Sequence, residues 1–209
     1  MGLAFALMWS SAFTSARVIV EYAPPMSALA LRFLVSGLLG VGIAWALGQS
    51  ARLTKSQWRA VVIFGICQNA LYLGLNFVAM KTVEASLAAI IASTMPLIVA
   101  LAGWLVFREK IRPLAMTGLL AGVIGVTIIM SARFSGGVDV AGVIYCGVGV
   151  VSLAVATLMV RNASSGGNVL MIVGLQMLVG AAVLFVPAVL LETHTCLLYT
   201  SDAADDLLC

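Results

Sequence analysis

Residues 85–107 read ASLAAIIASTMPLIVALAGWLVF, 23 consecutive residues without a charged side chain. At 1.5 Å of rise per residue, an α-helix of this length would extend about 34 Å, and the hydrocarbon core of a bilayer is about 30 Å thick. A soluble helix would need polar residues along one face, and this stretch carries only two serines, a threonine and a tryptophan. The stretch therefore predicts a membrane-spanning helix.

Six further apolar stretches of similar length surround it, separated by short polar segments. The chain of 209 residues is 63% hydrophobic and only 9% charged, whereas a soluble domain carries about 25% charged residues. The sequence thus predicts an all-α polytopic membrane protein with a single membrane domain. Its expected transmembrane helices are residues 2–20, 25–47, 61–80, 85–107, 114–130, 140–160 and 169–191.

The last fourteen residues, 196–209, differ from the rest. They begin with CLLYTSDAAD, which resembles the in-frame translation of a transposon-end sequencing adapter. We expect this segment to be a non-native tail and exclude it from the fold prediction; a genuine acidic tail is the alternative. The two remaining cysteines, Cys67 and Cys146, lie in apolar stretches and are expected to be packing residues.

The basic residues predict an orientation. If the helices alternate in direction, seven basic residues (Arg52, Lys55, Arg59, Arg108, Lys110, Arg112 and Arg161) lie on one side of the membrane and three (Arg17, Lys81 and Arg133) on the other. Lys and Arg accumulate on the cytoplasmic side of membrane proteins. We therefore expect the N-terminus in the cytoplasm.

A weak internal repeat appears when the chain is shifted by 144 residues. The shift aligns residues 30–37 with residues 174–181 and Arg17 with Arg161. A second copy that begins after five spans would run in the opposite direction, which is the inverted-repeat plan of many secondary transporters.

Three segments resemble the EamA-type drug/metabolite transporter superfamily. MWSSAFTSARVIVEYAPPMSALALRFLVSGLLG (residues 8–40) resembles its first two helices, and residues 70–111, with Pro96 at mid-helix and Glu109 beyond the end, resemble the third and fourth. TGLLAGVIGVTII (residues 117–129) resembles the fifth, with Gly118, Gly125 and Val126 in the expected places.

The resemblance implies ten helices in two five-helix inverted repeats. Residues 1–130 would form the first repeat, and residues 138–191 the first two helices of an incomplete second repeat. The resemblance implies a secondary transporter of small organic metabolites or drugs, in most bacterial relatives an exporter, in the cytoplasmic (inner) membrane. The expected partners are a small-molecule solute and the lipid bilayer, without nucleic acid, cofactor or metal; a homodimer is left open.

Polar residues inside the predicted third span are the first candidates for solute contact. Gln68, Asn69, Tyr72 and Asn76 follow helical spacings that place the last three on one face. Uncharged amides and a phenol can hydrogen-bond a polar solute. The alternative is that these groups hold helices together by hydrogen bonds.

Further candidates come from the first and fourth spans. Trp9, Ser10 and Thr14 would line the path, although Trp9 also suits packing, and Arg17 and Glu21 are expected to form an ion pair at the helix end. In the fourth span, Ser93 is a candidate for solute contact. Pro96 removes a backbone hydrogen bond, and the resulting bend is either a gate or a static kink.

Arg32, about 10 Å into the second span by helical rise, has two interpretations. It would bind an anionic solute or, the interpretation favoured here, extend to lipid headgroups or helix-end carbonyls. An intramembrane enzyme is disfavoured because no His, Asp or Glu lies inside a predicted span. The sequence also lacks an ion-channel filter motif. A structural subunit that only packs against a partner remains the alternative to a transporter.

Overall fold

The computed structural model describes the backbone of residues 2–108, 113–134, 137, 139–161 and 166–192, and the side chains of these residues except 2–10, 106–107 and 132–134. Every regular element in this part of the chain is helical. The elements are α1 (Gly2–Tyr22), α2 (Pro25–Ala46), α3 (Lys55–Phe64), η1 (Gly65–Leu73), α4 (Gly74–Ala79), α5 (Ala85–Ala92), α6 (Met95–Phe107), α7 (Pro113–Phe134), α8 (Val140–Val160) and α9 (Val169–Leu191).

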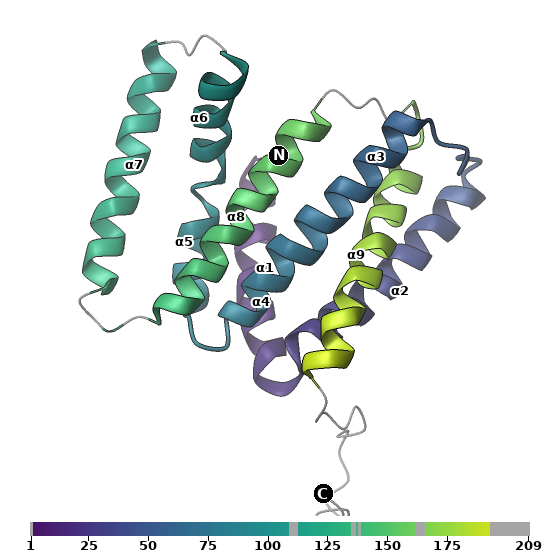
Figure 1. Ribbon diagram of the computed structural model, residues 1–209, viewed down its shortest axis with the longest axis horizontal. Coiled ribbons are helices and arrows are strands. Elements are labelled where there is room, and N and C mark those ends of the chain that lie inside the picture. The colour runs from purple at the N-terminus through teal and green to yellow at the C-terminus, as the bar shows by residue number, and fades with distance from the viewer. Residues whose placement is uncertain (1, 109–112, 135–136, 138, 162–165, 193–209) are drawn as a thin grey trace, which may run out of the picture.

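These elements form seven rods that run alternately up and down (Figure 1). The third rod consists of α3, η1 and α4, and the fourth consists of α5 and α6. Six rods are long and apolar enough to span a membrane, and α1 adds a helix of 21 residues. The predicted all-α polytopic fold is confirmed. The helix α7 stands apart from the other rods over much of its length, whereas α6 packs against α8 (Figure 1).

The helix bounds follow the local sequence signals. The helices α8 and α9 begin and end at the predicted residues. The third rod starts at Lys55, six residues before the predicted start, because Thr54 and Gln57 form a capping box. The first turns of α3 are polar, and hydropathy therefore missed them. The segment beyond residue 192 lies outside the described residues.

The fourth rod is interrupted where Pro96 was expected to bend it. The helix α5 ends at Ala92, and α6 begins at Met95 with Pro96 in its first turn. At the break, the hydroxyls of Ser93 and Thr94 donate to the carbonyls of Ile90 and Ile91, both at 2.6 Å. The Ser93 hydroxyl thus satisfies the Ile90 carbonyl, whose partner in a continuous helix would be the Thr94 N–H; that N–H donates to the Ile91 carbonyl at 3.0 Å instead.

The segment η1 is a nine-residue π-helix in the middle of the third rod. Its backbone approaches α9 closely: a Cβ on Gly65 would lie 2.8 Å from the carbonyl oxygen of Gln176. On its other side, the hydroxyl of Ser152 in α8 donates to the carbonyl of Cys67 at 3.1 Å. π-Helical turns are rare in proteins, and those that occur are frequently found at functional sites, so the third rod is a candidate for the functional site.

The helices α2 and α9 form the most extensive pair in the bundle and run antiparallel. Glu192, after the end of α9, accepts hydrogen bonds from the backbone N–H groups of Met26 and Ser27 at the start of α2, both at 2.8 Å. At the opposite end, Gln49, after the end of α2, accepts from the N–H of Met171 at the start of α9 at 3.0 Å. Each helix thus caps the N-terminus of the other.

Candidate functional site

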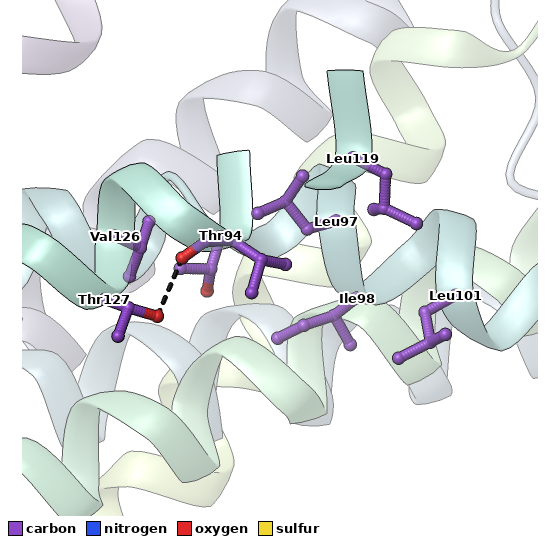
Figure 2. Close-up of a pocket in the computed structure, with 8 residues that line it drawn as sticks. Thr94, Leu97, Ile98, Leu101, Leu119, Val126 and Thr127 are labelled. Carbon is purple, nitrogen blue, oxygen red and sulfur yellow. Dashed lines mark hydrogen bonds between the residues drawn. The ribbon is translucent and has the colours of Figure 1, made fainter. Parts of the chain in front are cut away.

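Two hollows of different chemistry lie between the described helices. The larger, about 280 Å³, lies between α6 and α7 and is lined by Thr94, Leu97, Ile98, Leu101, Leu119, Val123, Val126 and Thr127 (Figure 2). Its two hydroxyls are already used: Thr94 donates to the Ile91 carbonyl, and Thr127 donates to the Val123 carbonyl at 2.8 Å (Figure 2). With both hydroxyl protons used, this largely apolar groove offers a polar solute only the two threonine oxygens as acceptors.

The smaller hollow, about 90 Å³, lies where α1, α2 and the third rod meet. We call it the arginine hollow, because Arg32, an exposed residue of α2, lines it together with Tyr72 and Asn76. Its lining residues are Ala12, Phe13 and Ala16 from α1, Arg32 from α2, Tyr72, Leu73, Asn76 and Phe77 from the third rod, and Met80 just after it. Polar side chains at membrane depth are costly unless they face a partner or water, so this cluster is the best candidate site.

Asn76 is the most constrained member of the arginine hollow. Its side chain is 1% exposed, and its Nδ2 donates to the Tyr72 carbonyl of its own helix at 2.8 Å. Its Oδ1 has no hydrogen-bond partner in the structure. The close approach of α8, where a Cβ on Gly149 would lie 3.1 Å from Nδ2, holds the amide in place. The orphaned oxygen is a buried acceptor ready for a donor.

Arg17 fixes one end of the arginine hollow. Its Nε donates to Glu21 at 3.2 Å, and its Nη1 donates to the carbonyls of Met80 and Val83 beyond α4. The predicted Arg17–Glu21 ion pair is confirmed. The same guanidinium also ties the end of α1 to the turn that follows the third rod.

The structure separates the polar residues predicted for the third span. Tyr72 and Asn76 line the arginine hollow, whereas Asn69, 5% exposed, faces α9 and donates through Nδ2 to the Gln176 carbonyl at 2.9 Å. A Cβ on Gly180 would lie only 2.4 Å from the Cβ of Asn69. The wider turn of η1 rotates Asn69 away from the face expected for an α-helix. Gln68 is half-buried and does not line this hollow.

The candidates from the first and fourth spans lie elsewhere. Thr14 is exposed, and α1 lines the arginine hollow with alanine and phenylalanine instead. Ser93 and Pro96 are exposed at the break between α5 and α6. The side chains of Trp9 and Ser10 lie outside the described residues.

Arg32 lines the arginine hollow and is exposed. Both interpretations from the sequence, contact with an anionic solute and extension to lipid headgroups, stay predictions. That Arg32 shares a hollow with Tyr72 and Asn76 depends on the packing of α2 against the third rod, which the sequence does not show. Within the described residues, no cluster of His, Cys, Asp and Glu has the composition of a metal site.

Comparisons with known proteins agree with this architecture. The chain is 27% identical over 202 residues to the uncharacterized transporter YvbV of Bacillus subtilis, covering 97% of this chain and 66% of that relative. It is 27% identical over 136 residues to the aromatic amino acid exporter YddG of Ancylobacter novellus, covering 65% of this chain and 47% of that protein. The chain thus spans less than two thirds of the length of either relative.

A solved crystal structure has the same fold. It superimposes with a TM-score of 0.63 at 23% sequence identity, over 88% of this chain and 65% of the other. The sequence model of the EamA-like transporter family matches residues 1–131, more than half of the chain. The chain therefore belongs to the EamA-like transporter family, whose members are multi-pass membrane transporters and not enzymes.

Proposed function

We propose that this chain is part of a secondary transporter that exports small organic solutes across a bacterial cytoplasmic membrane by alternating access. The observation that carries the proposal is the arginine hollow, which the exposed Arg32 of α2 lines together with the buried Tyr72 and Asn76 of the third rod. A transporter needs polar groups at membrane depth to replace the hydration of its solute. Packing alone would not need a buried amide oxygen without a partner.

Alternating access is supported by the inverted pairing of α2 and α9. A shift of 144 residues moves residues 25–46 of α2 onto residues 169–190 of α9, and the two helices run antiparallel with reciprocal caps. Such a pair is expected at the axis between two oppositely oriented repeats. We propose the corresponding domain plan, with residues 1–130 as the first repeat and residues 138–191 as the beginning of the second.

The remainder of the solute site would come from further helices. The arginine hollow of about 90 Å³ is smaller than most ligand pockets, which have about 300–1,000 Å³. It fits one polar group of a solute rather than a whole solute. In a ten-helix bundle the other repeat would supply the opposite wall, and the break between α5 and α6 would serve as a gate. A homodimer is a further prediction, tested by the mass of the purified protein.

The first experiment is to recover the intact locus beyond His194. We expect three more apolar spans and a total near ten helices, whereas a stop codon in the native frame after residue 194 would overturn the ten-helix plan.

The second experiment measures transport by the intact protein in proteoliposomes. Counterflow of radiolabelled amino acids, nucleosides, sugars and hydrophobic amines is compared with empty vesicles. Aromatic amino acids come first because one relative is named as their exporter. We expect accumulation of one class and its loss in Tyr72→Ala, with Trp58→Ala, an exposed position on α3, as the control. Accumulation of none of these classes would overturn the transporter proposal.

A further inference from the structure

The charges of the described residues are divided unequally between the two ends of the bundle. The end at which α2, α6 and α8 stop and α3 begins carries basic residues and, within the described part of the chain, no acidic one: Arg52, Lys55, Arg59, Arg108 and Arg161. The acidic residues of the same ranges lie at the opposite end: Glu21, Glu84, Asp139 and Glu192. The basic end therefore has no described carboxylate to balance its charge, and it favours an anionic partner.

Two of these cations lie on one face of the first turns of α3. Lys55 and Arg59 are four residues apart, a spacing that places their Cβ atoms about 5–6 Å from each other on a helix. Both residues are exposed, and within the described chain neither side chain forms a hydrogen bond or an ion pair. Like charges at this spacing destabilise a helix, so an anion bound between them would relieve their repulsion.

The opposite face of the same turns is filled by the protein itself. Gln57 and Val61 are buried. A Cβ on Gly166 would lie 3.1 Å from Nε2 of Gln57, so the segment before α9 packs against this side of α3. The exposed Lys55 and Arg59 therefore lie on the outer face of α3, away from the packed helices.

Tryptophan residues indicate that this outer face lies at the level of the lipid headgroups. Trp45 and Trp104 are exposed and lie within about 5 Å of the ends of α2 and α6 by helical rise. Tryptophan gathers at the headgroup level of a bilayer. Both helices end at the end of the bundle where α3 begins with Lys55 (Figure 1). The two cations of α3 are therefore expected at the membrane surface and not in the hydrocarbon core.

We propose that the outer face of α3 binds the headgroup of an anionic phospholipid. Lys55 and Arg59 bind the phosphate, and Arg52, exposed three residues before Lys55, adds a third positive charge nearby. Val62, 41% exposed and seven residues after Lys55 on the same face, contacts the start of an acyl chain. A zwitterionic lipid brings a cation that these side chains repel, whereas phosphatidylglycerol brings none. The inference goes beyond the proposed transport function and does not depend on it.

The test measures which lipids stay bound to the intact protein. The purified protein is equilibrated with equimolar phosphatidylglycerol and phosphatidylcholine of identical acyl chains, and native mass spectrometry gives the ratio of the two lipids in the complex that retains a single lipid. Because each basic residue near an anionic surface contributes about fivefold in binding, we expect about fivefold or more phosphatidylglycerol. Lys55→Gln/Arg59→Gln should lower the ratio to about twofold or less. Lys55→Arg/Arg59→Lys, which keeps both charges, should retain it.

The matched control is Lys81→Gln/Arg108→Gln, which removes two exposed cations outside α3. It should leave the ratio unchanged, and an equal fall in this control would show that the ratio reports total charge only. Equal retention of both lipids by the wild type would show that other parts of the intact protein cover the outer face of α3. A preference that persists in Lys55→Gln/Arg59→Gln would show that the lipid binds elsewhere. Each of these three results overturns the inference, and none bears on transport, because no solute enters the measurement.

Discussion

At the scale of single residues, two amides of the third rod have opposite roles. Asn69 donates a hydrogen bond through Nδ2 to the Gln176 carbonyl of α9. Asn76 donates through Nδ2 to the Tyr72 carbonyl of its own rod, and its Oδ1 has no hydrogen-bond partner. Spacing along the sequence placed both on one face. The π-helix separates them, because its wider turn changes the direction of every side chain that precedes Leu73.

This contrast predicts different effects on stability and on transport. Asn69→Ala should lower the free energy of unfolding by about 1 kcal/mol, because an interhelical hydrogen bond is lost. Asn76→Ala should change stability less and reduce solute flux. Thermal melting in detergent and counterflow on the same preparations measure both. Equal melting temperatures for Asn69→Ala and the wild type would show that the bond to Gln176 does not stabilise the bundle.

Asp139 allows a pH prediction outside the membrane spans. Hydrogen bonds from the Thr82 hydroxyl and from the N–H groups of Ala141 and Gly142 hold the pKa of this carboxyl below its ordinary value of 3.8. A lowered folded-state pKa means that the ionised group stabilises the fold above 3.8, and that this stabilisation disappears as the pH falls through the lower value. Asp139→Asn should therefore melt lower than the wild type at pH 7, and the difference should shrink below pH 3.8.

Thr82→Val provides the companion variant. Without the hydroxyl, the pKa of Asp139 should return towards 3.8, so the acid-induced loss of stability should be smaller than in the wild type and be complete at a higher pH. Melting curves between pH 3 and pH 7 measure the shift. A difference between wild type and Asp139→Asn that stays constant over this range would show that the charge of Asp139 is irrelevant to stability.

At the scale of helices, close contact between α2 and α9 depends on glycine. A Cβ on Gly174 would lie 2.8 Å from the backbone nitrogen of Val41 and 3.2 Å from the carbonyl oxygen of Gly37. Backbone atoms cannot move aside as a flexible side chain can, so Gly174→Ala should separate the helices and destabilise the protein by about 1–3 kcal/mol. Gly147→Ala on α8, where nothing lies within 4 Å of the added carbon, is the matched control.

The control should be neutral or slightly stabilising, because alanine favours helix over glycine. Melting temperatures of the two variants measure the difference. Equal melting temperatures would show that α2 and α9 can move apart without loss of stability, and that their close contact does not stabilise the bundle.

Helices were predictable here to different degrees, for physical reasons. The ends of α8 and α9 followed from hydropathy, because each is bounded by short polar segments. The start of α3 required the capping box at Thr54, which hydropathy ignores. The π-helix and the arginine hollow depend on the packing of helices that are distant in the chain: Gly65 approaches Gln176, and Arg32 lines the same hollow as Asn76. One sequence does not show that packing, so it indicates Tyr72, Asn76 and Arg32 as polar residues of their spans but not that they line one hollow.

At the scale of the whole molecule, the rods place the basic residues at two ends of the bundle. Among the described residues, Arg52, Lys55, Arg59, Arg108 and Arg161 lie at the end where α2 meets α3, α6 ends and α8 ends, and Arg17 and Lys81 lie at the other (Figure 1). The alternation assumed for the sequence count therefore agrees with the observed path of the chain. An excess of Lys and Arg on one side sets the orientation of a membrane protein during insertion. The end of the bundle that is richer in Lys and Arg is therefore expected in the cytoplasm.

Single-cysteine labelling tests this orientation directly. In a background without native cysteines, Ser50→Cys represents the richer end and Lys81→Cys the poorer end, and both positions are exposed. A membrane-impermeant maleimide added to intact cells should label Lys81→Cys and spare Ser50→Cys, and both should react after the membrane is opened. The reverse pattern would place the N-terminus outside. The start of α2, which Glu192 caps, would then face the cytoplasm instead of the exterior. Because Arg32 is closer to this end of α2 than to the other, an exported solute would then reach the arginine hollow from the start of α2.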